Sequence, residues 1–430
     1  MQIDVKMELK VNHSFAKYST LATLDIGSSK VCCLIAHVTS RDKKIEIVGY
    51  GYNASKGIKN GVVTDINQAT LSICNAVEDA EQQAKESISK LIINISGDKT
   101  NSLINHHVIQ LHKNRPISEA DIAKILQQSV SKIKNTDNEI VHCVPMNYTI
   151  DKKEVVKDPR NLYAETLGLD MLFGFYPSPL YKNLSNIIEN AHLEVALRTF
   201  SGYASALSCL VEDEKEIGAT VVDIGGGTTS ITTFKNGFPV YFATLPVGGN
   251  NITSDIAWGL TTSFAHAEDL KIRHGCAFLI TQDELQTIDV YPVGEEDDNS
   301  IRQVPKSDLI NIIVPRVEEI FEMVAKKLEE QGLKDVTNHR VVLTGGCSSL
   351  SGIRDVAALV LNKQVRLGIP RNIPNIPTYL YDPKFSTALG MFLFAINRKE
   401  YHPAPSSAGA INLGNIGGIK KILGWFKQNY

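Results

Sequence analysis

One short pattern occurs twice in this chain, and its repetition constrains the fold more than any other feature of the sequence. TLDIGSSKVCCLIAHV at residues 23–38 is similar to VVDIGGGTTSITTFKN at residues 221–236. In each copy an apolar run ends in Asp-Ile-Gly, a turn of small residues follows, and β-branched residues resume. Because the copies lie nearly half a chain apart, the repeat predicts two related halves.

Each copy is expected to form a β-hairpin, because the residues after the turn alternate between apolar and polar and carry no helical stripe. Walker and dinucleotide-binding loops differ, since their glycines open a helix. Glycines in such a turn let backbone N–H groups point at a phosphate. Hydroxyl donors can be added by Ser28, Ser29, Thr228 and Thr229.

An aspartate stands at the end of the first strand of each copy, at Asp25 and Asp223. Mg²⁺ usually keeps several of its waters, so these carboxylates are suited to bind it through water. Two facing hairpins would then hold the β- and γ-phosphates of a nucleotide from opposite sides. The alternative for either copy is an ordinary tight turn, and the pairing of the two copies favours phosphate binding.

Three further segments are consistent with a cleft between the halves. PVGGNNIT at residues 246–253 places two glycines directly before a helix, and VVLTGGCSSLSGI at 341–353 predicts a buried strand followed by another helix. Glu268 and Lys271 stand three residues apart, on one face of a predicted helix. They are candidates to bind a ribose, and the alternative is a solvated ion pair on a surface helix.

The composition excludes several classes of protein. At 430 residues, with 43% hydrophobic and 21% charged residues and a net charge of −3, the chain is expected to form two to four globular subdomains and not to bind nucleic acid. Its seven cysteines lack metal-ligand spacing and are expected to be reduced core residues. Neither a signal peptide nor a membrane-spanning helix is predicted, so we expect a cytosolic chain.

Taken together, the two turns, the Gly-Gly loop, the Glu-x-x-Lys helix and the late Thr-Gly-Gly loop resemble the actin, Hsp70 and sugar-kinase ATPase superfamily. From about residue 21 to 430 the chain resembles the FtsA family of bacterial cell-division proteins. The segments that carry this resemblance are GYNASKGIKNGVVTDINQAT, VVDIGGGTT, TSDIAWGL, KIRHGCA and the amphipathic C-terminal segment. The resemblance implies an α/β fold of the actin-like ATPase type, with two RNase H-like halves around a nucleotide cleft and a small inserted α+β subdomain.

The resemblance also implies how the chain is divided. The expected parts are an N-terminal extension at 1–20, a first half at 21–96, 175–205 and 375–400, an inserted subdomain at 97–174, a second half at 206–374 with a smaller lobe at about 255–340, a linker at 401–418 and a helix at 419–430. Within the insertion, PISEADIAKILQQSVSKI predicts a helix capped by Ser118, and HCVPMNYTI predicts a strand.

ATP and Mg²⁺ are the ligands that the resemblance implies, and it implies the residues that bind them. The first phosphate loop would comprise Asp25, Gly27, Ser28, Ser29 and Lys30, and the second Asp223, Gly225, Gly226, Gly227, Thr228 and Thr229. The ribose and base would be approached by Gly248, Gly249, Asn250, Glu268 and Lys271, and the adenosine covered by Gly345 and Gly346. Asp25 and Asp223 would reach the metal through water.

Two positions depart from the patterns of the superfamily. The second hairpin commonly continues Thr-Thr-Asp, whereas this chain has Ser230 at the carboxylate position. Chaperone and filament relatives orient the attacking water with Glu or Gln at the start of a connecting helix, where this chain has Ser201 and Gly202, an absence that FtsA proteins share. Because the groups that promote phosphoryl transfer are incomplete, we expect tight ATP binding with slow hydrolysis and assign no catalytic residue.

The C-terminal segment has the composition of a linker followed by a short amphipathic helix. On a helical wheel, Ile419, Ile422, Leu423, Trp425 and Phe426 fall in one arc of roughly 160°, and Lys420, Lys421 and Lys427 lie opposite. This pattern is typical of a helix that lies in the surface of an anionic membrane. The alternative is a terminal helix docked on the protein's own core. One such tail would bind reversibly, whereas many tails on one polymer would bind tightly.

These features predict an actin-like protein of bacterial cell division that polymerises and tethers the FtsZ ring to the cytoplasmic face of the inner membrane at the septum. The resemblance implies that the FtsZ C-terminal tail docks within about 255–340 and that other divisome proteins contact the insertion. The nearest alternative is an actin-like pilus-assembly ATPase, which does not ordinarily end in a basic amphipathic tail. A kinase of the superfamily would need an acidic general base, which nothing in the sequence marks.

Overall fold

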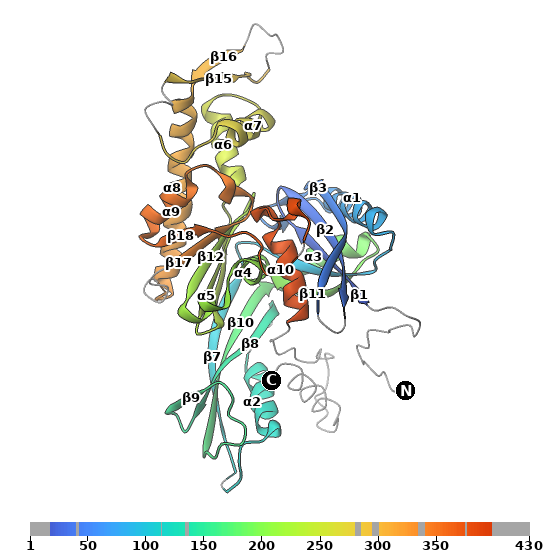
Figure 1. The fold of residues 1–430 in the computed structure, drawn as a ribbon, viewed down its shortest axis with the longest axis vertical. Helices are drawn as coiled ribbons and strands as arrows, with labels where there is room; N and C mark the ends of the chain where they lie inside the picture. Colours follow the sequence, from blue (N-terminus) through green and yellow to red (C-terminus); the bar gives the residue numbers. More distant parts are fainter. Residues whose placement is uncertain are drawn as a thin grey trace.

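The computed structural model describes residues 18–397, apart from 40–42, 113, 134–136, 280–284, 295–300, 334–339 and 375. The predicted linker at 401–418 and helix at 419–430 lie outside the described residues. The first strand already begins at Tyr18, within the predicted N-terminal extension. Figure 1 shows two sheets side by side at the centre, one lobe above the second sheet, and a separate lobe below both.

The first sheet has the strand order β3-β2-β1-β6-β11. Its strands are β1 Tyr18–Ile26, β2 Lys30–Thr39, β3 Ile45–Ala54, β6 Lys90–Ile95 and β11 Glu194–Phe200. The first three pair antiparallel, and β6 and β11 continue the sheet in parallel. Helices α1 (Ile66–Ala84) and α3 (Ser178–Asn190) cover one face, and α10 (Ser386–Ile396) covers the other. Since both faces are covered, β2 is buried on both sides instead of alternating.

The second sheet repeats this arrangement, with the strand order β14-β13-β12-β17-β18. Its strands are β12 Ala219–Ile224, β13 Thr229–Lys235, β14 Phe238–Leu245, β17 Arg340–Thr344 and β18 Gln364–Leu367. Again three antiparallel strands are followed by two parallel ones. The prediction of two related halves is therefore confirmed at the level of topology.

Helices cover the second sheet on both faces as well. One face packs against a large apolar cluster that includes α8 (Lys306–Glu330) and α9 (Ile353–Leu361), and the other packs against α4 (Ser201–Cys209). Helix α4 also lies directly against α10, where a Cβ atom at Gly390 would come within 1.8 Å of the carbonyl oxygen of Ala204. The two central helices thus approach more closely than any larger residue at 390 would allow.

The upper lobe in Figure 1 is inserted between β14 and β17. Its described elements are α6 Gly249–Gly259, α7 Phe264–His274, β15 Thr287–Val290, β16 Arg302–Pro305 and the first part of α8. The short helix α5 (Glu212–Ile217) precedes β12 at the opposite end of the sheet. Among the described helices, none combines the length and apolarity needed to cross a membrane.

The lower lobe is a four-stranded antiparallel sheet of order β7-β10-β8-β9, covered on one face by α2. Its elements are β7 Asn101–Gln110, α2 Glu119–Ser131, β8 Asn138–Ile150, β9 Glu154–Val156 and β10 Thr166–Pro177. As predicted, Ser118 is the N-cap of α2, and its backbone N–H donates to the Asp121 carboxylate. The insertion is joined to the first half by short connections. Residues 96–100 link β6 to β7, and α3 starts directly after β10.

Candidate functional site

A cleft with a cavity volume of about 450 Å³ lies between the two sheets, where the β1–β2 and β12–β13 turns face each other. The predicted residues that line it are Asp25, Gly27, Ser28, Ser29, Lys30, Asp223, Gly225, Gly226, Thr228, Gly249, Asn250, Glu268, Lys271, Gly345 and Gly346. Three predicted residues do not line it. The Thr229 hydroxyl donates to the Val247 carbonyl, 2.8 Å away. Gly227 and Gly248 are buried where two loops pack together, Gly227 against Ser28 and Gly248 against the carbonyl of Gly225.

The two turns have the same internal geometry. The backbone N–H of Gly27 donates to the carbonyl of Lys30 at 2.9 Å, and that of Gly225 donates to the carbonyl of Thr228 at 2.8 Å. The turns also touch, since a Cβ atom at Gly226 would lie 1.8 Å from the hydroxyl oxygen of Ser29. Glycine at 226 is thus required by the close approach of the opposite turn.

Asp25 is held by partners on its own sheet. Its carboxylate accepts from Lys30 Nζ at 2.5 Å and from Asn94 Nδ2 at 2.9 Å. Asn94 stands on β6 and also accepts from the Ile26 backbone N–H, at 2.7 Å. Burial alone would lower the pKa of Lys30, but the Asp25 carboxylate outweighs burial and the pKa lies above its ordinary value.

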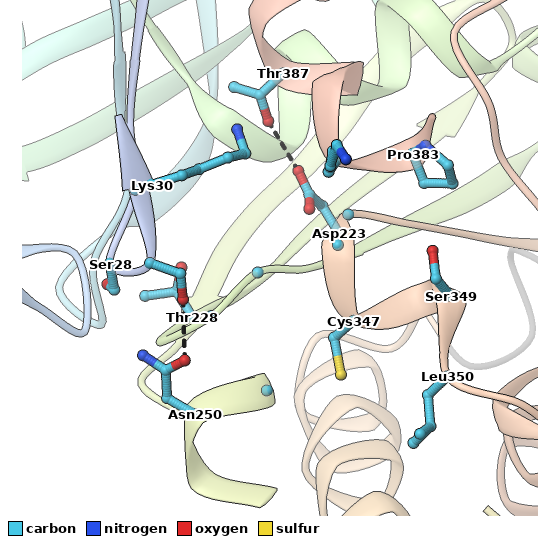
Figure 2. Close-up of a pocket in the computed structure, with 18 of the residues that line it drawn as sticks. Ser28, Lys30, Asp223, Thr228, Asn250, Cys347, Ser349, Leu350, Pro383 and Thr387 are labelled. Carbon is cyan, nitrogen blue, oxygen red and sulfur yellow. Dashed lines mark hydrogen bonds between the residues drawn. The ribbon is translucent and has the colours of Figure 1, made fainter. Parts of the chain in front are cut away.

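Asp223 has different partners. Its Oδ2 atom accepts from the Ser205 hydroxyl at 2.5 Å and from the Thr387 hydroxyl at 3.0 Å, the second of which is drawn in Figure 2. A Cβ atom at Gly345 would lie 2.2 Å from Oδ1, so only glycine fits beside that oxygen. Burial, and then the charge of Asp25, raise the pKa of Asp223 above that of an ordinary carboxyl.

The start of α6 is fixed to the second turn by backbone bonds. The N–H groups of Gly249 and Asn250 donate to the carbonyls of Gly225 and Gly226, at 2.9 Å and 2.7 Å. The Asn250 side chain in turn accepts from Ser29 at 2.9 Å and so connects α6 to the first turn. This helix therefore contacts both sides of the cleft.

The predicted pair on α7 is partly buried, unlike a solvated surface pair. Lys271 Nζ donates to Glu268 at 2.7 Å, to the Thr253 hydroxyl at 2.8 Å and to the Gly249 carbonyl at 3.1 Å. The Lys271 side chain is 11% exposed. The ion pair thus ties α7 to α6 while lining the cleft.

Comparison with known proteins identifies the family. A family model described as cell division protein FtsA matches residues 220–390, and one described as the SHS2 domain inserted in FtsA matches residues 97–173. Cell division protein FtsA of Rhizobium meliloti (strain 1021) is 33% identical over 420 residues, which cover 95% of each chain. The chain belongs to the FtsA family of cell division proteins. FtsA of Escherichia coli K12 is 29% identical, over 95% of this chain and 97% of that one.

Solved structures place this FtsA-family chain in the actin-like ATPase fold. A chain of the PilM-PilN type IV pilus biogenesis complex matches with a TM-score of 0.59 and 15% identity, over 87% of this chain and 97% of that one. MreB5 of Spiroplasma citri bound to ADP matches with a TM-score of 0.54 and 12% identity, over 89% of this chain and 98% of that one. The predicted fold class is confirmed. Since these identities show the fold alone, the pilus-assembly alternative gains no support over the FtsA family.

Sequence reasoning on this FtsA-family chain missed several residues of the cleft. Asn94, Ser205 and Thr387 contact the two aspartates, and Cys347 and Lys384 line the cleft. Asn94 interrupts an apolar run, LIINIS, that predicts a buried strand, so its polar side chain was a usable signal. Ser205 and Thr387 stand in helices rich in small residues, and nothing local indicates that they meet at Asp223.

A short hairpin packs on the first turn of the cleft. It consists of β4 (Ile58–Lys59) and β5 (Val62–Val63), joined by Asn60 and Gly61, which both have positive φ. The Gly61 N–H donates to the Ser28 hydroxyl at 3.0 Å, and a Cβ atom at Gly61 would lie 2.7 Å from the Ser96 carbonyl oxygen. The hairpin belongs to the GYNASKGIKNGVVTDINQAT segment that carries the FtsA resemblance.

Proposed function

We propose that this chain binds ATP with Mg²⁺ in the cleft, polymerises, and tethers the FtsZ ring to the cytoplasmic face of the inner membrane at the septum. The observation that carries the proposal is the pair of turns of equal internal geometry that face each other across the cleft, each following an aspartate. Membership of a cell-division family supports the setting in which this cleft would act.

The cleft suits a nucleoside triphosphate. Backbone N–H groups and hydroxyls of the two turns would bind the phosphates, and Asp25 and Asp223 would hold Mg²⁺ through its waters. When bound, the metal neutralises phosphate charge. Glu268 and Lys271 would approach the ribose and base, and Gly345 and Gly346 would cover the adenosine. MreB5, which has the same fold, is bound to ADP in its structure, which supports a nucleotide as the ligand.

Hydrolysis in this cleft is proposed to be slow. Ser230 and Ser201 line the cleft at the two positions where relatives of the superfamily carry acidic or amide side chains. Ser201 donates to the Ile95 carbonyl at 3.2 Å, and Ser230 lies 3.4 Å from the Thr244 hydroxyl. Of the acidic residues that line the described cleft, Asp25 and Glu268 are each already paired with a lysine. Asp223, the remaining acidic residue of the described lining, is assigned to the waters of the metal, which leaves no further carboxylate among the described cleft residues to orient an attacking water.

The C-terminal helix, the insertion and the lobe at about 255–340 are proposed to bind the membrane, other divisome proteins and FtsZ, as the sequence predicts. The helix at 419–430 would bind anionic lipid, and ATP-bound protomers would form filaments that hold the membrane through many tails. The insertion would contact other divisome proteins. The FtsZ tail would dock on the lobe at about 255–340, where Trp258, Phe264 and Tyr291 are exposed, Trp258 to 90%.

Co-sedimentation with liposomes tests the membrane role. The full chain and a version that ends at Gly418 are spun with anionic or neutral vesicles, with and without ATP and Mg²⁺. The proposal expects the full chain to pellet with anionic vesicles mainly in ATP, and the truncated chain to stay in the supernatant. A charge-reversed variant, Lys420→Glu with Lys421→Glu, keeps the segment and serves as the matched control. Equal pelleting of the full and truncated chains would contradict a terminal membrane anchor.

A further inference from the structure

The aspartates at the ends of β1 and β12 occupy equivalent places in the duplicated fold but have different partners. Both carboxylate oxygens of Asp25 are occupied, Oδ2 by Lys30 and Oδ1 by Asn94. On Asp223, both hydroxyl contacts fall on one oxygen, Oδ2. The other oxygen, Oδ1, accepts no hydrogen bond from the described residues; it packs against the backbone of Gly345, where a Cβ atom would come within 2.2 Å of it, and Asp223 lines the cleft.

The two hydroxyls on Asp223 form a closed triangle with it. Ser205 and Thr387 lie 2.5 Å and 3.0 Å from Oδ2, and each donates its single hydrogen there, so their own separation of 2.8 Å is a close contact of the two oxygens. All three side chains are buried, with exposed fractions of 0% for Ser205 and 7% for Thr387 and Asp223. Hydrogen bonds to an ionised carboxylate are among the stronger ones and offset part of the free-energy cost of burying the charge. Together they also fix the rotation of the carboxylate.

We propose that Ser205 and Thr387 are positioning residues for Mg²⁺: they hold Oδ2 of Asp223 so that Oδ1 faces a water of the metal. This inference rests on the proposed binding of Mg²⁺ and ATP in the cleft. It assigns different tasks to the two aspartates. Asp25 balances the charge of Lys30 in addition to facing the waters of the metal, whereas Asp223, which has no lysine partner, offers the oriented oxygen.

The triangle also joins the two halves of the molecule. Asp223 stands on β12 in the second sheet, whereas Thr387 stands on α10, which packs on the first sheet. Movement of α10 away from β12 would remove a donor from Asp223 and free the carboxylate to rotate. Metal binding at Asp223 is therefore coupled to the position of α10, and the coupling passes through the Thr387 hydroxyl.

The test measures how the binding of a fluorescent ATP analogue to the full chain depends on Mg²⁺. Thr387→Val replaces the hydroxyl with a methyl group of similar size, and Ser205→Ala removes the other donor. Each variant is expected to raise the Mg²⁺ concentration at half-maximal binding by about tenfold, because each loses one hydrogen bond to a charged group. Binding in EDTA should change less than about twofold. Thr387→Ser should restore the wild-type Mg²⁺ dependence.

Ser208→Ala is the matched control. Ser208 is equally buried in the same region, but its hydroxyl donates to the carbonyls of Ser205 and Ser386 and not to Asp223. The inference is overturned if Thr387→Val and Ser205→Ala change binding equally with Mg²⁺ and in EDTA, or if Ser208→Ala has the same effect on the Mg²⁺ dependence. A wild-type chain that does not bind the analogue at any Mg²⁺ concentration would instead overturn the proposed function itself.

Discussion

Ser29 and Asn250 form a hydrogen bond of 2.9 Å that joins the β1–β2 turn of the cleft to the N-terminus of α6. The two residues lie 221 positions apart in the chain. If the bond only fastened the turn to the helix, an aspartate at 250 would accept it equally well. The sequence predicted that Asn250 approaches the ribose and base, but its bond to Ser29 places the side chain at the first turn, where an added negative charge beside bound phosphates would be unfavourable.

We therefore expect Asn250→Asp to weaken ATP binding more than Asn250→Ala, by about tenfold, because it keeps the acceptor but repels the phosphates. Titration with a fluorescent ATP analogue measures the two affinities. The difference should shrink in high salt, which screens the repulsion. Equal affinities of the two variants at low salt would show that the phosphates do not lie next to Asn250.

A methyl group at position 226 should separate the two turns. Gly226→Ala would place Cβ 1.8 Å from the Ser29 hydroxyl oxygen, whereas Gly225→Ala would come no closer than 3.3 Å, to the Thr228 carbonyl oxygen. We expect Gly226→Ala to lose at least about tenfold in ATP affinity and Gly225→Ala to lose clearly less. The same titration measures both. Adding Ser29→Gly to Gly226→Ala removes the clash and should restore part of the affinity, and no recovery would contradict the steric explanation.

Removing the charge of Asp223 should stabilise the nucleotide-free protein. Its pKa is raised by burial, so the folded state favours the protonated carboxyl and loses stability as the pH rises from the usual carboxyl pKa, about 4, through the raised value. Asp223→Asn is therefore expected to melt at a higher temperature than wild type at pH 7, with the difference shrinking toward pH 4. It should also lose the stabilisation given by Mg²⁺ and ATP, as thermal unfolding with and without ligand would measure.

The equivalent change in the first turn should act in the opposite direction. Asp25→Asn leaves the partly buried Lys30 ammonium without its carboxylate partner, which we expect to destabilise the fold by about 2 kcal/mol. Denaturant unfolding of both variants provides the comparison. Equal shifts of the two aspartate variants would show that their environments do not differ as described.

Loss of the Asp121 carboxylate should loosen the insertion locally. Hydrogen bonds from the Arg115 guanidinium and, to a smaller extent, from Ser118 hold the pKa of Asp121 below its usual range. The Asp121 carboxylate therefore stabilises the fold above the ordinary carboxyl pKa, and this stabilisation is lost as the pH falls. Asp121→Ala is expected to speed amide hydrogen exchange across α2 at neutral pH. Lys124→Ala changes an exposed residue of the same helix and should leave exchange unchanged. Equal exchange rates in the two variants would show that the Asp121 cap does not stabilise α2.

Local patterns in the sequence predicted the parts of the site that lie on single loops or helices. Both turns and the Glu268–Lys271 pair were predicted because strand ends, glycines and helical spacing are visible within a few residues. The supports of the aspartates were not, since Asn94 reaches Asp25 from 69 residues away and Thr387 reaches Asp223 from 164. Such contacts depend on which strands and helices become neighbours, and only the fold decides that.

The tight junction between the first half and the insertion affects how far a small movement at the cleft would travel. The carbonyl of Ser96, one residue before the insertion, accepts from the Tyr176 hydroxyl of β10 and packs against Gly61, which donates to Ser28 in the first turn. Strand β10 has twelve residues and extends about 40 Å from this junction. The insertion is connected to the first half by residues 96–100 at one end and directly from β10 to α3 at the other. A rotation of about 5° at this junction would therefore become a sweep of about 3.5 Å at the far tip of the strand. A change at the first turn too small to see locally would thus be easiest to detect as a displacement of the tip of the insertion.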